Sequence, residues 1–96
     1  MLFHTTFKAK VSFTHEVQKR ALELWAKWQP PKGLEMKAFY MAADGRGFTI
    51  AEVESAEAAY EANAPWLVFF DFELVPIVEI EKAAGIAQKA IAFRES

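Results

Sequence analysis

The pattern of hydrophobic and polar positions predicts four strands and three helices along the chain. Alternating apolar and polar residues rich in Phe, Thr, Val and Ile are typical of strands, whereas apolar residues spaced three and four apart are typical of helices. These patterns predict strands over residues 1–10, 34–42, 48–54 and 70–79, and helices over 15–28, between Ser55 and Pro65, and over about 80–93. A short separate turn is expected over 66–69, because Pro65 ends the second helix.

The boundaries of these elements carry signals of their own. Thr14 and Ser55 precede the first two helices, where a side-chain oxygen can accept a hydrogen bond from a free backbone N–H. The pair Pro30–Pro31 ends the first helix. The run Asp44–Gly45–Arg46–Gly47 favours a tight turn, so the second and third strands should form a hairpin. Pro76 cannot donate a backbone hydrogen bond, which predicts that the fourth strand lies at a sheet edge.

The order strand, helix, strand, strand, helix, strand indicates an α+β fold. It is typical of a ferredoxin-like sandwich, in which right-handed crossovers place both helices on one face of a four-stranded antiparallel sheet. The usual spatial order, 4-1-3-2, agrees with an edge position for the fourth strand. Ninety-six residues suit a single domain over 1–96, to which the helix over about 80–93 is an addition.

Both faces of the predicted sheet carry apolar residues. In the first strand Phe3 and Phe7 lie on one face and Leu2 on the other, and the fourth strand shows the same pattern. A sheet covered by helices on one side only is expected to be polar on its other side. We therefore expect a homodimer in which the second faces of two sheets meet. In the second strand, alternation places Leu34, Met36, Ala38 and Tyr40 on a single face.

Composition and charge exclude several classes of protein. Hydrophobic residues make up 53% of the chain, which excludes a disordered protein. The net charge of −2 argues against nucleic acid as a partner. Cysteine is absent, so no disulfide or Cys-based zinc site is expected. No apolar run reaches the length of a membrane span and no signal peptide is visible, so a soluble, cytoplasmic protein without a membrane partner is expected. No phosphate loop or dinucleotide fingerprint predicts a cofactor.

Four short segments resemble a known family. They are Met1–Phe3, Pro30–Leu34, Ala43–Phe48 and Phe72–Ile77, and the chain is similar over most of its length to domain-of-unknown-function family 3303. The resemblance implies a small bacterial protein of the dimeric α/β-barrel type. It implies no established activity and therefore no catalytic residue. The wider barrel group includes small monooxygenases and isomerases, which is an analogy of fold alone.

His4 and Tyr40 are the candidate catalytic residues. Histidine changes its charge near neutral pH, and His4 lies in mid-strand, where a barrel pocket could form. A packed or hydrogen-bonded histidine at a sheet interface explains the same position. Tyr40 has a phenol that could orient a substrate. His4 and His15 are separated by most of a strand and do not have the spacing of metal ligands, so no metal is expected.

Aromatic residues are the candidate ligand-binding group. Trp25, Trp66 and Phe69, with neighbouring rings, could line a pocket for a flat apolar molecule between helices and sheet. Packing of the core or of an interface explains many of these rings equally well. If the tryptophans surround His4, they would form a dry wall that shifts its pKa.

Other polar groups have simpler explanations. Four carboxylates, Asp71, Glu73, Glu79 and Glu81, could supply a general base, but charges on an edge strand also prevent further strand pairing. Asp44 and Arg46 are explained by the chemistry of the turn, although Arg46 could contact an anion.

The combined pattern favours a homodimeric domain that binds a small apolar or aromatic molecule, or that acts mainly as an assembly module. The alternative is a small cofactor-independent enzyme, monooxygenase-like or isomerase-like, that uses His4. RNA binding is a remote alternative, suggested by Arg46–Gly47–Phe48. The third strand lacks the further aromatic residues that an RNA-stacking surface requires.

Overall fold

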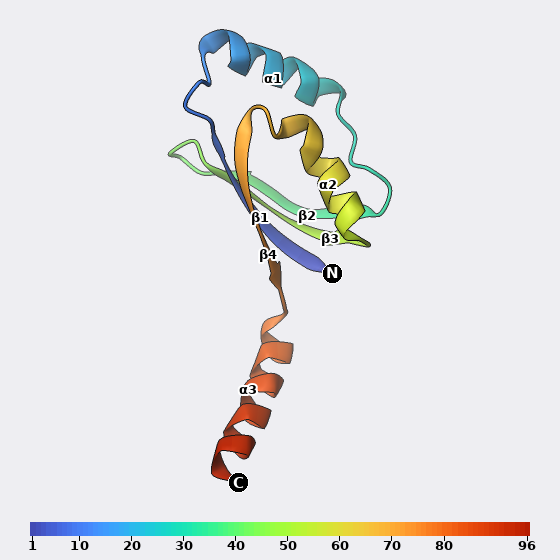
Figure 1. Ribbon diagram of the computed structural model, residues 1–96, viewed down its shortest axis with the longest axis vertical. Helices are drawn as coiled ribbons and strands as arrows, with labels where there is room; N and C mark the ends of the chain where they lie inside the picture. Colours follow the sequence, from blue (N-terminus) through green and yellow to red (C-terminus); the bar gives the residue numbers. More distant parts are fainter.

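A computed structural model describes residues 1–96 and has the α+β architecture that the sequence predicts. The elements are β1 (Leu2–Ala9), α1 (His15–Lys27), β2 (Leu34–Met41), β3 (Gly47–Val53), α2 (Ala56–Asn63), the 3-10 helix η1 (Ala64–Trp66), β4 (Phe70–Ile77) and α3 (Ile80–Glu95). The strands form one antiparallel sheet in the order β2-β3-β1-β4, so β4 is an edge strand, as Pro76 indicates (Figure 1). This arrangement is consistent with a ferredoxin-like fold.

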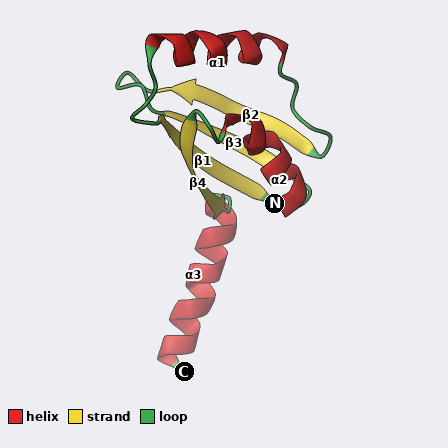
Figure 2. Cartoon of the chain, turned by 45° about the horizontal axis from the view of Figure 1, so that its top comes forward, coloured by secondary structure: helices red, strands yellow, loops and turns green.

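Helices α1 and α2 cover one face of the sheet and leave the other face without a cover (Figure 2). Phe3, Thr5 and Phe7 of β1 point towards these helices, together with Phe70, Phe72 and Leu74 of β4. The intervening residues of β1 and β4 form the opposite face, which we call the outer face. In register across it, Leu2 pairs with Ile77 and His4 with Val75. The apolar character of both faces is therefore a property of the folded sheet.

Strand β2 departs from simple alternation. Its register against β3 shifts between Met36 and Ala38: Met36 pairs with Ala51 and Ala38 with the next residue, Ile50, so β2 has one extra residue at this point. Leu34 and Met36 face the helices, whereas Ala38 and Tyr40 lie on the outer face with their β3 partners. The expectation that all four residues share one face was wrong, because the extra residue Lys37 reverses the alternation.

The predicted caps and turn are present. Thr14 Oγ1 accepts a hydrogen bond from the Val17 N–H at 3.3 Å, and Ser55 Oγ accepts one from the Ala58 N–H at 3.1 Å. Gly45 has φ of 91°, a conformation that glycine adopts without steric cost, and this allows the tight β2–β3 connection.

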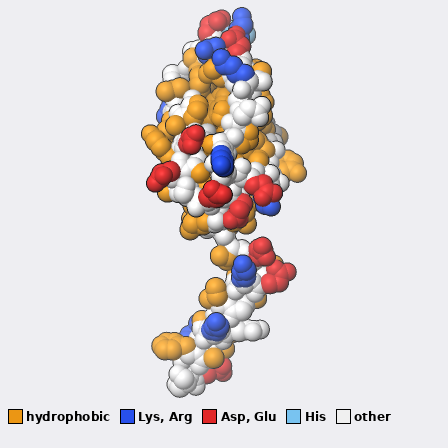
Figure 3. All heavy atoms as spheres, turned by 90° about the vertical axis from the view of Figure 1, so that its right-hand side faces the viewer, with side chains coloured by type: hydrophobic (Ala, Val, Ile, Leu, Met, Phe, Trp, Pro, Cys, Tyr) orange, Lys and Arg blue, Asp and Glu red, His pale blue; other side chains and the backbone are white.

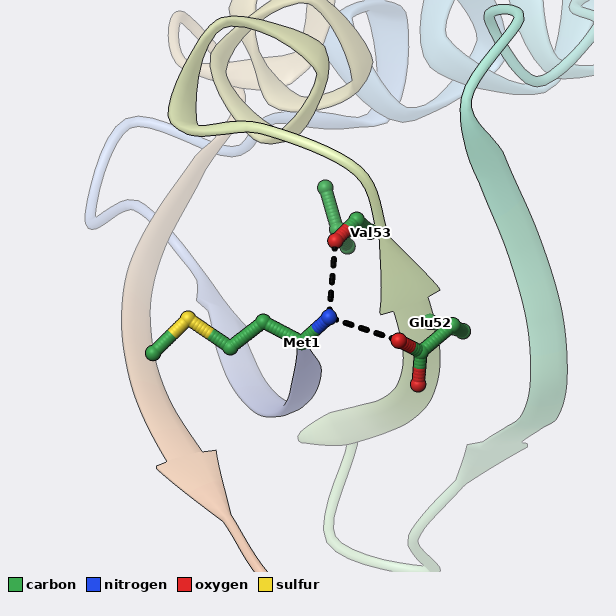
Figure 4. A network of polar contacts seen from close by, with 3 residues as sticks. All are labelled: Met1, Glu52 and Val53. Carbon is green, nitrogen blue, oxygen red and sulfur yellow. Dashed lines mark hydrogen bonds and ion pairs between the residues drawn. The ribbon is translucent and has the colours of Figure 1, made fainter.

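The amino group of Met1 fixes the start of β1 against β3. It donates to Glu52 Oε1 at 2.6 Å and to the Val53 carbonyl oxygen at 3.0 Å (Figure 4). These two contacts hold the first residue beside the end of β3.

The hydrophobic core of one chain is small. Only 10 of 96 residues are buried, and the main cluster joins β3 to α2 through Ala51, Val53, Ala58 and Ala59. The Cα radius of gyration is 17.2 Å, whereas a compact domain of this length has a radius of about 12.5 Å. Much of the difference arises from α3, which projects away from the sheet beyond the end of β4 (Figure 1).

Candidate functional site

A large apolar cleft lies between α1 and the sheet. Its volume is about 710 Å³, and 20 of its 25 lining residues are hydrophobic. Ligand pockets in proteins typically measure about 300–1,000 Å³ and are mostly apolar. We call this space the helix–sheet cleft. Its floor is formed by Phe3, Phe7, Met36, Phe39 and Phe72, which come from three of the four strands.

Three tryptophans line one side of the cleft and hold α1 away from the sheet. Trp25 and Trp28 stack at 5.7 Å between ring centroids, and Trp66 of η1 lies 6.4 and 6.1 Å from them. Trp25 also meets Phe39 of β2 edge-on at 5.2 Å. Because these rings are large and rigid, α1 rests on them and does not approach the backbone of the sheet. The cleft is the space that remains beside this contact.

The floor of the cleft also carries two hydroxyl groups. Thr5 of β1 and Thr49 of β3 face each other directly in the strand register, and both line the cleft. Gln18 of α1 and Asn63 of α2 complete its polar side chains. No lining residue is charged. The site can therefore offer hydrogen bonds to a neutral polar group, but it provides no ion pair for a charged one.

The sequence-based candidates are divided between the two sides of the sheet. Trp25 and Trp66 line the cleft, whereas Phe69 does not line it and is buried, 6.2 Å from Trp66 between ring centroids. His4 and Tyr40 lie on the outer face, where both contact Phe48, at 5.4 and 5.6 Å between ring centroids. The expected dry wall of tryptophans around His4 was wrong, because alternation in β1 turns His4 away from the helices.

The threonine pair was absent from the sequence-based candidates. Alternation in β1 already places Thr5 between Phe3 and Phe7 on the helix-facing side, so one half of the pair was visible in the sequence. The pairing with Thr49 depends on the β1–β3 register, which is set by long-range contacts and not by the local pattern.

Charged side chains form pairs outside the cleft. Lys10 Nζ lies 2.6 Å from Asp71 Oδ1, and this hydrogen bond, with smaller contributions from the charges of Lys10 and Lys8, lowers the pKa of the Asp71 carboxyl. At the β2–β3 turn, a hydrogen bond from the Arg46 side chain is the main cause of a lowered pKa for Asp44. No three acidic or histidine side chains gather closely enough to hold a metal ion. No helix combines the length and the apolar character needed to cross a membrane.

Comparison with known proteins identifies a family and no function. A family model described as a domain of unknown function, DUF3303, matches residues 1–91. Searches of curated proteins and of solved structures gave no match. The chain belongs to the DUF3303 family, which agrees with the resemblance in its four sequence segments.

Proposed function

We propose that this member of the DUF3303 family is a homodimeric domain that binds a small, uncharged, apolar or aromatic molecule in the helix–sheet cleft. The observation that carries the proposal is the cleft itself, which combines a volume of about 710 Å³ with a predominantly hydrophobic lining that contains no charged residue. A charged ligand would lose its hydration on entering without gaining an ion pair, which costs several kcal/mol. A flat neutral molecule would instead stack on the aromatic walls.

The paired hydroxyls of Thr5 and Thr49 support a more specific expectation for the ligand. Each hydroxyl can donate one hydrogen bond and accept up to two, and the two are adjacent on an otherwise apolar floor. A neutral carbonyl, phenol or hydroxyl group on the ligand would satisfy both of them. The favoured ligand class is therefore an aromatic or alicyclic molecule with one neutral oxygen function.

The chain contains a natural reporter for this site, because all three of its tryptophans line the cleft. Titration with Nile red, a flat neutral dye with a carbonyl group, should change tryptophan emission and saturate at one dye per chain. Thr5→Val keeps the side-chain shape and removes the hydroxyl, and it should weaken binding about threefold to tenfold, as expected for a hydrogen bond of about 1 kcal/mol.

Thr6→Val is the matched control, since the neighbouring Thr6 lies on the outer face of the same strand. This variant should bind the dye as the parent protein does. Equal weakening in both variants, or a titration without saturation, would contradict binding in the cleft.

The homodimer part of the proposal is supported by the uncovered outer face. Leu2, Phe48, Ile50, Val75 and Ile77 are apolar residues of this face, and no helix of the same chain covers them. Specific interfaces bury at least about 1,000 Å², and one face of a four-stranded sheet is large enough to contribute its half. Light scattering at micromolar concentration should give twice the chain mass of 10.9 kDa, and the mass of a single chain would refute the dimer.

An enzymatic alternative places proton transfer at His4, with Tyr40 as an orienting donor. The observation that favours it is that the two rings flank Phe48 on one sheet face. A substrate would then bind at the dimer interface and not in the cleft. His4→Ala should in that case abolish turnover while leaving dye binding in the cleft unchanged. If His4→Ala disrupts the dimer and abolishes no activity, His4 has a packing role at the dimer interface.

A further inference from the structure

Helix α3 exposes an unpartnered apolar face. At about 100° per residue, its large apolar residues form two stripes about 140° apart, with Ile80 and Ile91 in one and Ile86 and Phe93 in the other, and mostly alanines between them. Ile86 and Phe93 lie one above the other in the second stripe, seven residues apart, and they are 61% and 79% exposed. Figure 3 shows α3 below the body of the protein, with hydrophobic side chains open along its length.

A second apolar groove lies along the edge of the sheet. It has a volume of about 410 Å³ and runs between β4 and α2 on the helix-covered side. Tyr60, Leu67 and Leu74 are among its eight hydrophobic lining residues, and they are exposed in the single chain. We call it the edge groove. The groove-lining residues of β4 lie between Phe70 and Leu74, about 14 Å along the strand, and the α3 segment from Ile86 to Phe93 rises about 10 Å, so this segment fits along the groove.

We propose that the edge groove of each chain receives α3 of a second copy, so that two copies exchange their C-terminal helices. This inference deepens the homodimer part of the proposed function and is independent of the ligand. In this arrangement Ile86 and Phe93 of one copy insert between β4 and α2 of the other.

Charge complementarity favours this occupant. Lys82 and Lys89 border the Ile86–Phe93 stripe on one side of α3. Helix α2 carries Glu57 and Glu61 beside its groove-lining residues and has no basic residue, and the one basic residue that lines the groove, Lys10, forms an ion pair with Asp71 at 2.6 Å. An exchanged α3 can therefore place its two lysines against the two glutamates, which also defines the rotation of the helix in the groove.

The connection between β4 and α3 argues against the alternative in which α3 folds back on its own chain. Only Val78 and Glu79 separate the two elements, and Glu79 is extended, with φ −67° and ψ 149°. A reversal of direction over two residues requires a tight turn, which favours Gly, Asn, Asp or Pro. Neither residue is of this kind, and valine is stiffer than most. The helix therefore leaves the body of its own chain.

Cysteine cross-linking tests the exchange directly, because the chain has no native cysteine. The full chain is prepared as two single variants, Ile86→Cys on α3 and Leu67→Cys at the edge groove, and the two are mixed and mildly oxidised. We expect a disulfide between positions 86 and 67 of different chains, identified by mass spectrometry, at fivefold or higher yield than the control. The control mixture replaces Ile86→Cys by Gln88→Cys, on the opposite side of the same helix.

Two results would overturn the exchange. One is equal cross-linking in the two mixtures. The other is an intrachain disulfide in the double variant at submicromolar concentration, which would mean that α3 folds back on its own chain. Neither result affects dye binding in the helix–sheet cleft, so failure of the exchange and failure of ligand binding are distinguishable.

A charge exchange provides a second measurement that does not depend on oxidation. Glu61→Lys and Lys89→Glu should each raise the dimer dissociation constant about threefold or more, and mixing the two variants should restore heterodimers in which the new charges are opposite. Mixtures that dissociate as readily as either variant alone would overturn the proposed contact.

Discussion

Gly47→Ala should destabilise the protein through packing against the floor of the helix–sheet cleft. A Cβ atom at position 47 would lie 2.7 Å from Cε2 of Phe7 and 2.8 Å from Sδ of Met41. Carbon atoms in favourable contact are about 3.5–4.0 Å apart, so one of these groups must move. The φ angle of Gly47 is not positive, and backbone strain therefore contributes nothing to the cost.

The size of the effect depends on which group can move. Met41 is 58% exposed and flexible, so it can rotate away at little cost. Phe7 is only 8% exposed, and its ring is held edge-on by Phe39 and Phe70, at 5.9 and 5.4 Å between centroids. Overpacking of this kind costs about 1–3 kcal/mol. We expect a loss of about 2 kcal/mol in the free energy of unfolding.

A double-mutant cycle with Phe7→Leu tests the physical cause. Leucine lacks the ring atoms that clash, so Gly47→Ala in the Phe7→Leu background should cost less than about 0.5 kcal/mol. The coupling energy is then about 1.5 kcal/mol, which is within the range measured for residues in contact. Urea unfolding followed by circular dichroism at one fixed protein concentration gives all four values. An equal cost of Gly47→Ala in both backgrounds would refute the proposed clash.

Three further predictions concern the Lys10–Asp71 ion pair, the helix cap at Ser55 and helix α3. The hydrogen bond from Lys10 lowers the pKa of Asp71, so the ionised carboxylate stabilises the folded state. This stabilisation is fully present above the ordinary Asp pKa of about 3.9 and is lost as the pH falls through the lowered pKa. Lys10→Ala should therefore flatten the dependence of Tm on pH below about 4. Ser55→Ala leaves the Ala58 N–H without its partner and should cost about 1 kcal/mol in urea unfolding, and an unchanged midpoint would contradict the cap. Gly85→Ala adds a methyl group with nothing within 4 Å and should stabilise α3 by about 1 kcal/mol, seen as increased helicity at 222 nm.

The local signals in the sequence predicted most of the fold. The caps at Thr14 and Ser55, the glycine turn and the edge position of Pro76 all depend on chemistry within a few residues, and the structure confirms each of them. The bulge at Lys37 could not be predicted, since no glycine or proline marks it. That one residue moves Tyr40 to the opposite side of the sheet.

The candidate site was predictable only in part. The aromatic residues of α1 and η1 were identifiable as a group, and the structure places Trp25 and Trp66 on a common cleft. The existence of the cleft depends on the distance between α1 and the sheet, which follows from how Trp25 rests on Phe39. Periodicity describes which side of an element is apolar, but it contains no information on the space between two elements.

The apolar surfaces of the chain differ in how much of their wall comes from the same chain. The helix–sheet cleft lies between α1 and the strands of its own chain, so α1 already occupies the place of a helix over this part of the sheet. A small molecule can use the space that remains, about 710 Å³. The outer face and the edge groove are long and open, which suits another protein chain. The tryptophans of α1 and η1 belong to the walls of the cleft, so a small apolar molecule can stack on them whether or not a second copy covers the outer face.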